Sequence, residues 1–203
     1  MRREIITGLL MGLGAWQFLA RSAGASIIGH SYLDNTVVTN PQYSWGHQTD
    51  GSGTTYLMNV SGDQAASSGQ LVTSITTDTA IDPTLIVGNS VNNDTGFTWT
   101  GYDVSVSMSN PFTLSGALVS TPSDWSATVT PPALIGGQYV GYIDYSAGTP
   151  IPVGGTLDFQ YTLAFSGGTN YSFTETVTPV PEPASLGLLT LGVVAMLGRR
   201  NRA

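Results

Sequence analysis

The chain has 203 residues, no cysteine and a formal net charge of −7 at pH 7, with 6 basic and 13 acidic side chains. All the basic residues are arginines at the two ends, so the stretch 22–198 contains neither lysine nor arginine. Such a stretch repels phosphate backbones, which excludes nucleic-acid binding, and the lack of cysteine excludes disulfides and thiolate metal sites. The length suits one domain with processing segments.

Residues 1–25 have the pattern of a secretory signal peptide. A charged start precedes a predominantly apolar run at 5–20, and Ala23 and Ala25 supply the small side chains that signal peptidase accepts. We therefore expect export through the secretion translocon and cleavage after Ala25. An uncleaved membrane anchor is the alternative interpretation.

Residues 26–178 alternate apolar and polar side chains in the manner of β-strands. The period of two is clearest at 102–109 and 157–165. A Gly-rich turn separates the second run from 171–177, so we expect a β-hairpin over 156–177. Further strands are predicted at 55–60, 71–77, 84–88, 116–120, 127–130 and 138–145. Many short strands predict an all-β body, an immunoglobulin-like or jelly-roll β-sandwich.

The edge strands of such a body have no lysine to block the addition of a further strand. We therefore expect proline, bulges, aspartates or covering loops to protect them. Without that protection, self-association would become the expected behaviour.

No catalytic signature is present in the sequence. His30 and His47 lie near Asp34 and Asp50, but serine and aspartate are so abundant that a Ser-His-Asp arrangement on paper carries little weight. We expect no enzymatic activity, no cofactor and no metal, with a secreted hydrolase as a distant third function. Calcium is conceivable at 50–53 or 92–94, although Asp and Asn favour such turns without a metal.

Three tryptophans of the body and the nine tyrosines of the chain are candidates for stacking on sugars. Trp45 and Trp125 lie in loop-like surroundings and are the better candidates, whereas Trp99 is expected in the core. A carbohydrate-binding β-sandwich module is therefore the alternative function.

The C-terminal segment 179–203 combines three features. Pro181-Glu182-Pro183 is a stiff, extended tripeptide, and the uncharged run 184–198 would form a helix of about 22 Å, short for a hydrocarbon layer of about 30 Å. Arg199, Arg200 and Arg202 hold the tip in the cytoplasm by the positive-inside rule. We expect a short C-terminal transmembrane helix that holds the chain in the inner membrane only transiently, with the body on the outer side of that membrane. A permanent tail anchor is the alternative.

This order of features closely resembles the PEP-CTERM sorting signal. The resemblance implies recognition by an exosortase, a membrane-embedded transpeptidase-like enzyme that cuts near Pro181-Glu182-Pro183 and releases or transfers the body. The tripeptide acts as a substrate, and the arginines act as cytoplasmic stop residues. Proteins of this kind are typical of Gram-negative bacteria that make exopolysaccharide and biofilm.

A second resemblance lies in the body. Residues 92–102 are similar to an "N-x-T-G-x-x-W-T-x-Y/F" segment that recurs in PEP-CTERM proteins. The resemblance implies a turn followed by a central strand. Where that segment often carries Asp and His, this chain has Gly101, Tyr102 and Asp103.

The sequence thus predicts an exported, exosortase-processed protein in three parts, namely signal peptide 1–25, body 26–178 and sorting signal 179–203. The body is expected to be a structural or adhesive component of the cell surface or exopolysaccharide matrix. The expected partners are the translocon, signal peptidase, exosortase and exopolysaccharide.

Overall fold

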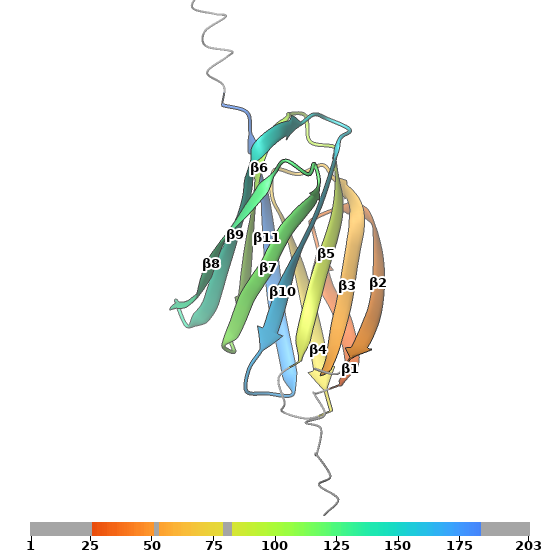
Figure 1. Cartoon of the computed structure of the whole chain (residues 1–203), viewed down its shortest axis with the longest axis vertical. Coiled ribbons are helices and arrows are strands. Elements are labelled where there is room, and N and C mark those ends of the chain that lie inside the picture. The colour runs from red at the N-terminus through yellow and green to blue at the C-terminus, as the bar shows by residue number, and fades with distance from the viewer. Residues whose placement is uncertain (1–25, 51–52, 79–82, 184–203) are drawn as a thin grey trace, which may run out of the picture.

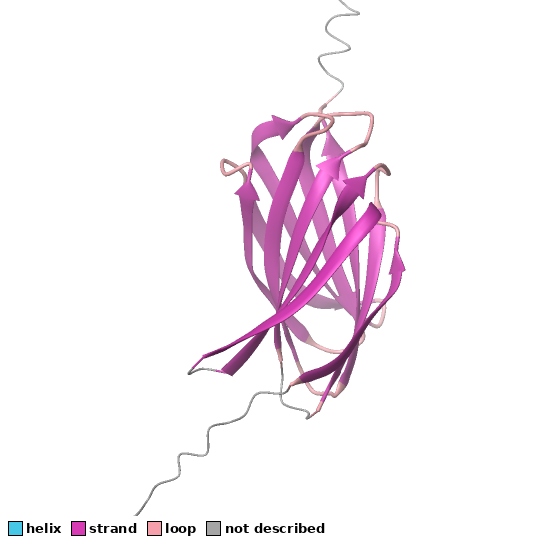
Figure 2. Ribbon diagram, turned by 90° about the vertical axis from the view of Figure 1, so that its right-hand side faces the viewer, coloured by secondary structure: helices cyan, strands magenta, loops and turns pink. Residues whose placement is uncertain are grey.

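The computed structural model describes residues 26–50, 53–78 and 83–183. The predicted signal helix in 1–25 and the predicted transmembrane helix in 184–198 lie outside the described residues. Within the described part every regular element is a strand, and no helix there is long and apolar enough to cross a membrane (Figure 2).

The strands are β1 Ile27–Asn35, β2 Thr39–Asp50, β3 Gly53–Gln64, β4 Gly69–Thr77, β5 Thr84–Asn93, β6 Trp99–Met108, β7 Phe112–Thr121, β8 Ser126–Ile135, β9 Gln138–Ile151, β10 Thr156–Phe165 and β11 Asn170–Pro181. They form two sheets that pack face to face and do not close into one another (Figure 1). The first sheet has the order β1-β4-β11-β6-β9-β8 and the second has the order β2-β3-β5-β10-β7. The prediction of an all-β body is confirmed.

Each strand predicted from the alternation is present, but β1 and β2 were not predicted. The predicted hairpin over 156–177 is wrong. β10 belongs to the second sheet and β11 to the first, so the turn between them carries the chain across the sandwich. Phe165 and Tyr171 meet between the sheets, with ring centroids 4.7 Å apart. The prediction failed for a physical reason. A period of two shows which face of a strand is buried, but it does not show which other strand is hydrogen-bonded to it.

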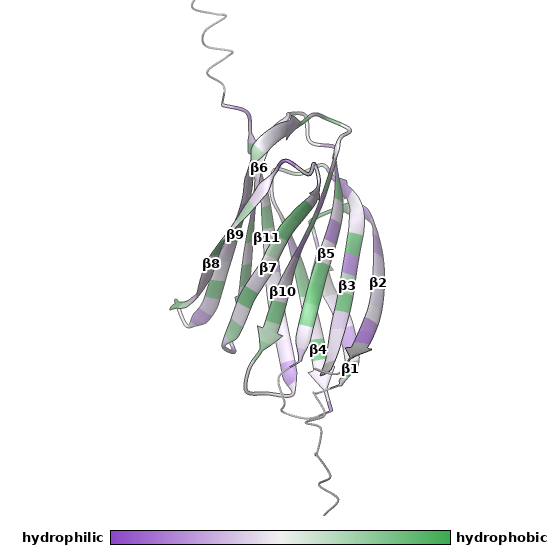
Figure 3. Ribbon diagram, in the orientation of Figure 1, coloured by the Kyte–Doolittle hydropathy of each residue, from purple (hydrophilic) through white to green (hydrophobic). Residues whose placement is uncertain are grey.

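The core lies between the two sheets. Polar and apolar residues alternate along the strands (Figure 3), and most of the large apolar ones are buried between the sheets. An aromatic cluster joins the layers, since the Phe159 ring of the second sheet lies 5.3 Å from Tyr102 and 4.9 Å from Tyr145 of the first. Tilted rings at these separations add to the free energy gained by burial.

The turn before β6 has the form that the second resemblance implies. The Asn93 side-chain amide donates to the carbonyls of Phe97 and Ile151, at 2.9 and 3.1 Å, and its oxygen accepts from the Thr95 amide at 3.0 Å. Trp99 Nε1 donates to Thr95 Oγ1 at 2.8 Å. Trp99 is fully buried at the start of β6, an interior strand, which confirms its assignment to the core.

A carboxyl group is also buried between the sheets. Glu175 of β11 is 1% exposed, and its Oε1 accepts from Asn89 Nδ2 of β5 at 3.3 Å. The Tyr161 hydroxyl interacts with the carboxyl, but neither that hydroxyl nor Glu175 Oε2 has a partner in normal hydrogen-bond geometry. Burial raises the pKa of Glu175 to about 7, and the interactions with Tyr161 and Asn89 lower it only in part.

All four edge strands carry irregularities. The β8 register shifts where Pro131 and Pro132 remove two backbone donors. The β7 register shifts at Gly116, whose φ is +60°, and β1 and β2 also have register shifts. Proline and bulges are thus present at the edges as expected, and their protective effect stays a prediction.

Candidate functional site

The Pro-Glu-Pro motif begins inside the last strand. Pro181 ends β11 and pairs with Trp99 of β6, and the Glu182 amide donates to the Thr98 carbonyl at 3.2 Å. Pro181, Glu182 and Pro183 are nevertheless all exposed. The motif is therefore accessible while its first two residues are held against the body.

The two ends of the described body lie at opposite ends of the sandwich (Figure 1). β1 and β11 both start beside the end of β4. Ile27, the first residue of β1, pairs with Thr77, and Asn170, the first residue of β11, pairs with Thr76. β11 ends at the other extremity. The loops 94–98, 122–125 and 152–155 lie at this same extremity, since each joins strand ends there. A membrane segment that follows Pro183 would start at this extremity.

The tryptophan candidates are placed differently from the expectation. Trp45 lies on β2 rather than in a loop, is half-buried, and is stacked on His30 with ring centroids 4.2 Å apart. Trp125 is 5% exposed and donates from Nε1 to the Thr149 carbonyl at 2.7 Å, so the expectation of an available ring is wrong. The hydrogen bond to Thr149 in β9, 24 positions away in the sequence, holds this ring inward, and the local composition does not reveal it.

The described residues of the histidine and calcium candidates are distributed over several strands. His30 and His47 are exposed on the edge strands β1 and β2, and the side chains of Asp34 and Asp50 are outside the description. Of the calcium candidates, Asn92 is bonded to Asp63 and Thr156 on the neighbouring strands, and Asn93 is bonded within the turn before β6. Residues 51–52 of the other candidate lie outside the described residues. Across the described ranges, no group of three or more His, Asp or Glu is arranged to hold a metal ion.

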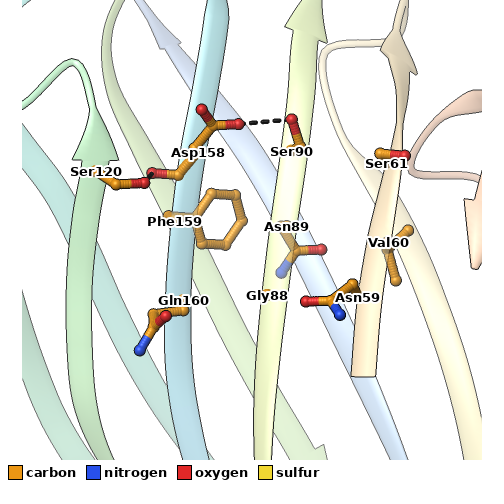
Figure 4. Close-up of a pocket in the computed structure, with 10 residues that line it drawn as sticks. All are labelled: Asn59, Val60, Ser61, Gly88, Asn89, Ser90, Ser120, Asp158, Phe159 and Gln160. Carbon is orange, nitrogen blue, oxygen red and sulfur yellow. Dashed lines mark hydrogen bonds between the residues drawn. The ribbon is translucent and has the colours of Figure 1, made fainter. Parts of the chain in front are cut away.

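The outer face of the second sheet has a hollow of about 270 Å³ (Figure 4). Gly88 has no side chain there, which leaves space between the amides of Asn59 and Gln160. The carboxylate in this hollow, Asp158, already accepts a hydrogen bond of 2.5 Å from Ser90. The hollow is therefore polar and internally bonded.

The outer face of the first sheet has a larger groove of about 410 Å³. Two rows of side chains cross β8, β9, β6 and β11 there: Thr130, Tyr142, Ser105 and Thr176 in one row, and Thr128, Asp144, Asp103 and Thr178 in the other. Tyr142 is 46% exposed, so part of its ring faces solvent. The groove thus places an aromatic ring beside hydroxyls and carboxylates.

The groove also contains an unusual pair of like charges. Asp103 and Asp144 are directly opposite on neighbouring strands, and neither carboxylate makes a hydrogen bond to a described side chain or backbone group. Partial burial, and next the charge of Asp144, raise the pKa of Asp103. Sequence reasoning missed this pair because residues 41 positions apart meet only through the β6–β9 register.

The described part is therefore an acidic, two-layer β domain whose last strand leads directly into an exposed Pro-Glu-Pro tripeptide. The family model of the PEP-CTERM protein-sorting motif matches residues 179–203. The chain is thus an exported, exosortase-targeted protein that is anchored transiently in the membrane before processing.

No curated protein and no solved structure matches the chain. The immunoglobulin-like or jelly-roll subclass therefore stays a prediction.

Proposed function

We propose that the processed body is a structural or adhesive component of the cell surface or exopolysaccharide matrix, without catalytic activity. The observation that carries the proposal is the position of the sorting motif. Pro183 follows immediately on the folded sandwich, so a cut at or beyond this residue delivers the body with β11 intact.

The N-terminal side supports the same route. β1 begins at Ile27, so cleavage after Ala25 removes the signal peptide and leaves the first strand whole. The register shifts and prolines of the edge strands also suit a domain that is delivered as a separate folded unit. Signal peptidase and exosortase then act at the two opposite extremities of the sandwich.

The intact mass of the protein from membrane and extracellular fractions of its native host tests the proposal. We expect an extracellular product that begins at Ser26 and ends near Pro181-Glu182-Pro183, with any added mass revealing transfer to another molecule. A Glu182→Ala variant should accumulate in the membrane with its C-terminus intact. Asp94→Ala changes another exposed acid of the same extremity and should be processed normally.

A wild-type product that stays in the membrane and keeps residues 199–203 would contradict the proposal. It would indicate a permanent tail anchor instead.

A carbohydrate-binding module is the second candidate function. The observation that favours it is the groove of the first sheet, with Tyr142 half-exposed among hydroxyl and carboxylate groups. This function is compatible with delivery to a polysaccharide matrix.

A further inference from the structure

We propose that the groove of the first sheet binds a neutral glycan chain lying across β8, β9, β6 and β11. The inference deepens the second candidate function above and does not depend on how the body is processed. It identifies the site, the residues that contact the sugar and the class of glycan.

The shape of the groove suits an elongated ligand. The two rows of side chains run perpendicular to the strands, and four neighbouring strands span about 14 Å at the usual strand spacing. The buried Val104 and Ile143 form its floor, which belongs to the core and is therefore rigid. A rigid groove costs little conformational entropy when a ligand binds.

Tyr142 provides the apolar contact that a sugar ring needs. A sugar has an apolar face of C–H groups and a rim of hydroxyls, and a half-exposed tyrosine offers a flat ring with a polar end. The flanking residues in its row, Thr130 and Ser105, carry hydroxyls that both donate and accept. One face of a sugar and its rim can therefore be satisfied together.

Asp103 and Asp144 provide the acceptors. Like charges that face each other across two strands are destabilising, and no lysine or arginine exists in 22–198 to relieve them. Sugar hydroxyls are donors, and a hydrogen bond from a hydroxyl to a carboxylate is among the stronger kinds. Both carboxylates are exposed on the outer face of the sheet, so the hydroxyls of a bound glycan can reach them and donate to them.

The charge of the groove determines the class of glycan. An anionic polysaccharide would bring further negative charge to two carboxylates without a compensating cation, so a neutral chain is favoured. A calcium ion would need about six to eight oxygen ligands, and the two carboxylates belong to no group of three or more acidic or histidine side chains in the described part of the chain.

The hollow on the second sheet lacks this combination. Its carboxylate is already bound by Ser90, and its one aromatic residue, Phe159, is buried. Residues on that face therefore serve as matched controls for the groove.

Isothermal titration calorimetry of the full chain tests the proposal, in a detergent without a sugar headgroup. The probes are the neutral oligosaccharides cellohexaose, laminarihexaose and mannohexaose, and the anionic probe is an alginate oligomer. We expect binding of at least one neutral probe. Tyr142→Ala and the double variant Asp103→Asn, Asp144→Asn should each weaken it about tenfold or more, since each removes stacking or charge-assisted hydrogen bonds.

Gln160→Ala on the opposite face should leave the affinity unchanged, and the far-UV circular dichroism of all variants should match the wild type. Absence of binding to every neutral probe would overturn the proposal, as would binding that survives Tyr142→Ala. Binding of alginate alone, dependent on added calcium, would show a cation-bridged site instead. None of these results alters the mass of the processed protein, so the two proposals fail separately.

Discussion

Glu175 shows how one buried side chain couples the stability of the body to pH. The carboxyl lies between the sheets with a single hydrogen bond, and its pKa rises from 4.5 to about 7. Below pH 4.5 it is protonated in both the folded and the unfolded chain. As the pH rises towards 7 the unfolded chain ionises first, so the free energy of unfolding falls.

We predict that the wild type loses about 3 kcal/mol of unfolding free energy between pH 4.5 and pH values above 7 through this group. Glu175→Gln keeps the shape and cannot ionise, so it should abolish this loss and be the more stable protein above pH 7. Urea unfolding of both proteins across this pH range measures the difference. Parallel stability curves would refute the assignment.

The last strand carries both a structural and a sorting role. β11 is central in the first sheet, and its last residues 179–181 pair with β6. Pro179 is buried, and the Thr100 hydroxyl lies 3.4 Å from the Val180 carbonyl and 3.3 Å from that of Pro181. The body therefore continues beyond residue 178 into the matched sorting motif.

A body that ends at Thr178 should consequently be less stable than one that ends at Pro183. We expect a loss of about 1–3 kcal/mol, because two or three net hydrogen bonds and the packing of Pro179 disappear. Chemical unfolding of chains spanning 26–178 and 26–183 measures it. Equal midpoints would mean that the end of β11 contributes nothing to folding.

Two prolines in β8 are expected to prevent the addition of a further strand to the edge of the first sheet. Pro131 and Pro132 interrupt the ladder of the outermost strand of the first sheet. Replacing both with valine restores two backbone donors and a higher strand propensity, so we expect concentration-dependent self-association in size-exclusion chromatography.

The matched control for this edge is Pro111→Val, which changes an exposed proline in the turn before β7. It should stay monomeric. A monomeric double variant would contradict the assignment of this protection to the two prolines.

Nearly all charged side chains of the body are acidic. Of the 13 acidic residues, all but Glu4 lie in 22–198, a stretch whose only potential cations are two histidines. The body therefore gains nothing from Lys or Arg ion pairs, and its acids repel one another at neutral pH.

Added sodium chloride should accordingly raise the midpoint of thermal unfolding of the body at pH 7, since screening weakens the repulsion between surface acids. Most proteins with surface ion pairs lose some of that attraction under the same conditions. A midpoint that falls steadily as salt is added would contradict this account.

Strand content and most strand positions followed from the alternation of side chains, because burying one face of a strand requires a period of two wherever the strand lies. The positions of β1 and β2 did not follow from this alternation, since their residues are exposed or half-buried and the two faces of each strand differ little in polarity. The burial of Trp99 was predictable from its place at the start of a strand. The burial of Trp125 depended on a carbonyl 24 positions away.

The sequence alone determined the negative charge, the absence of disulfides and the sorting motif at 179–203, because these properties belong to composition and to contiguous residues. Only the tertiary structure decided that β10 and β11 lie in opposite sheets, that Glu175 is enclosed between them, and that Asp103 faces Asp144 beside Tyr142. Each depends on hydrogen-bond register between distant strands, and a local pattern with a period of two is the same for every register that buries the same face.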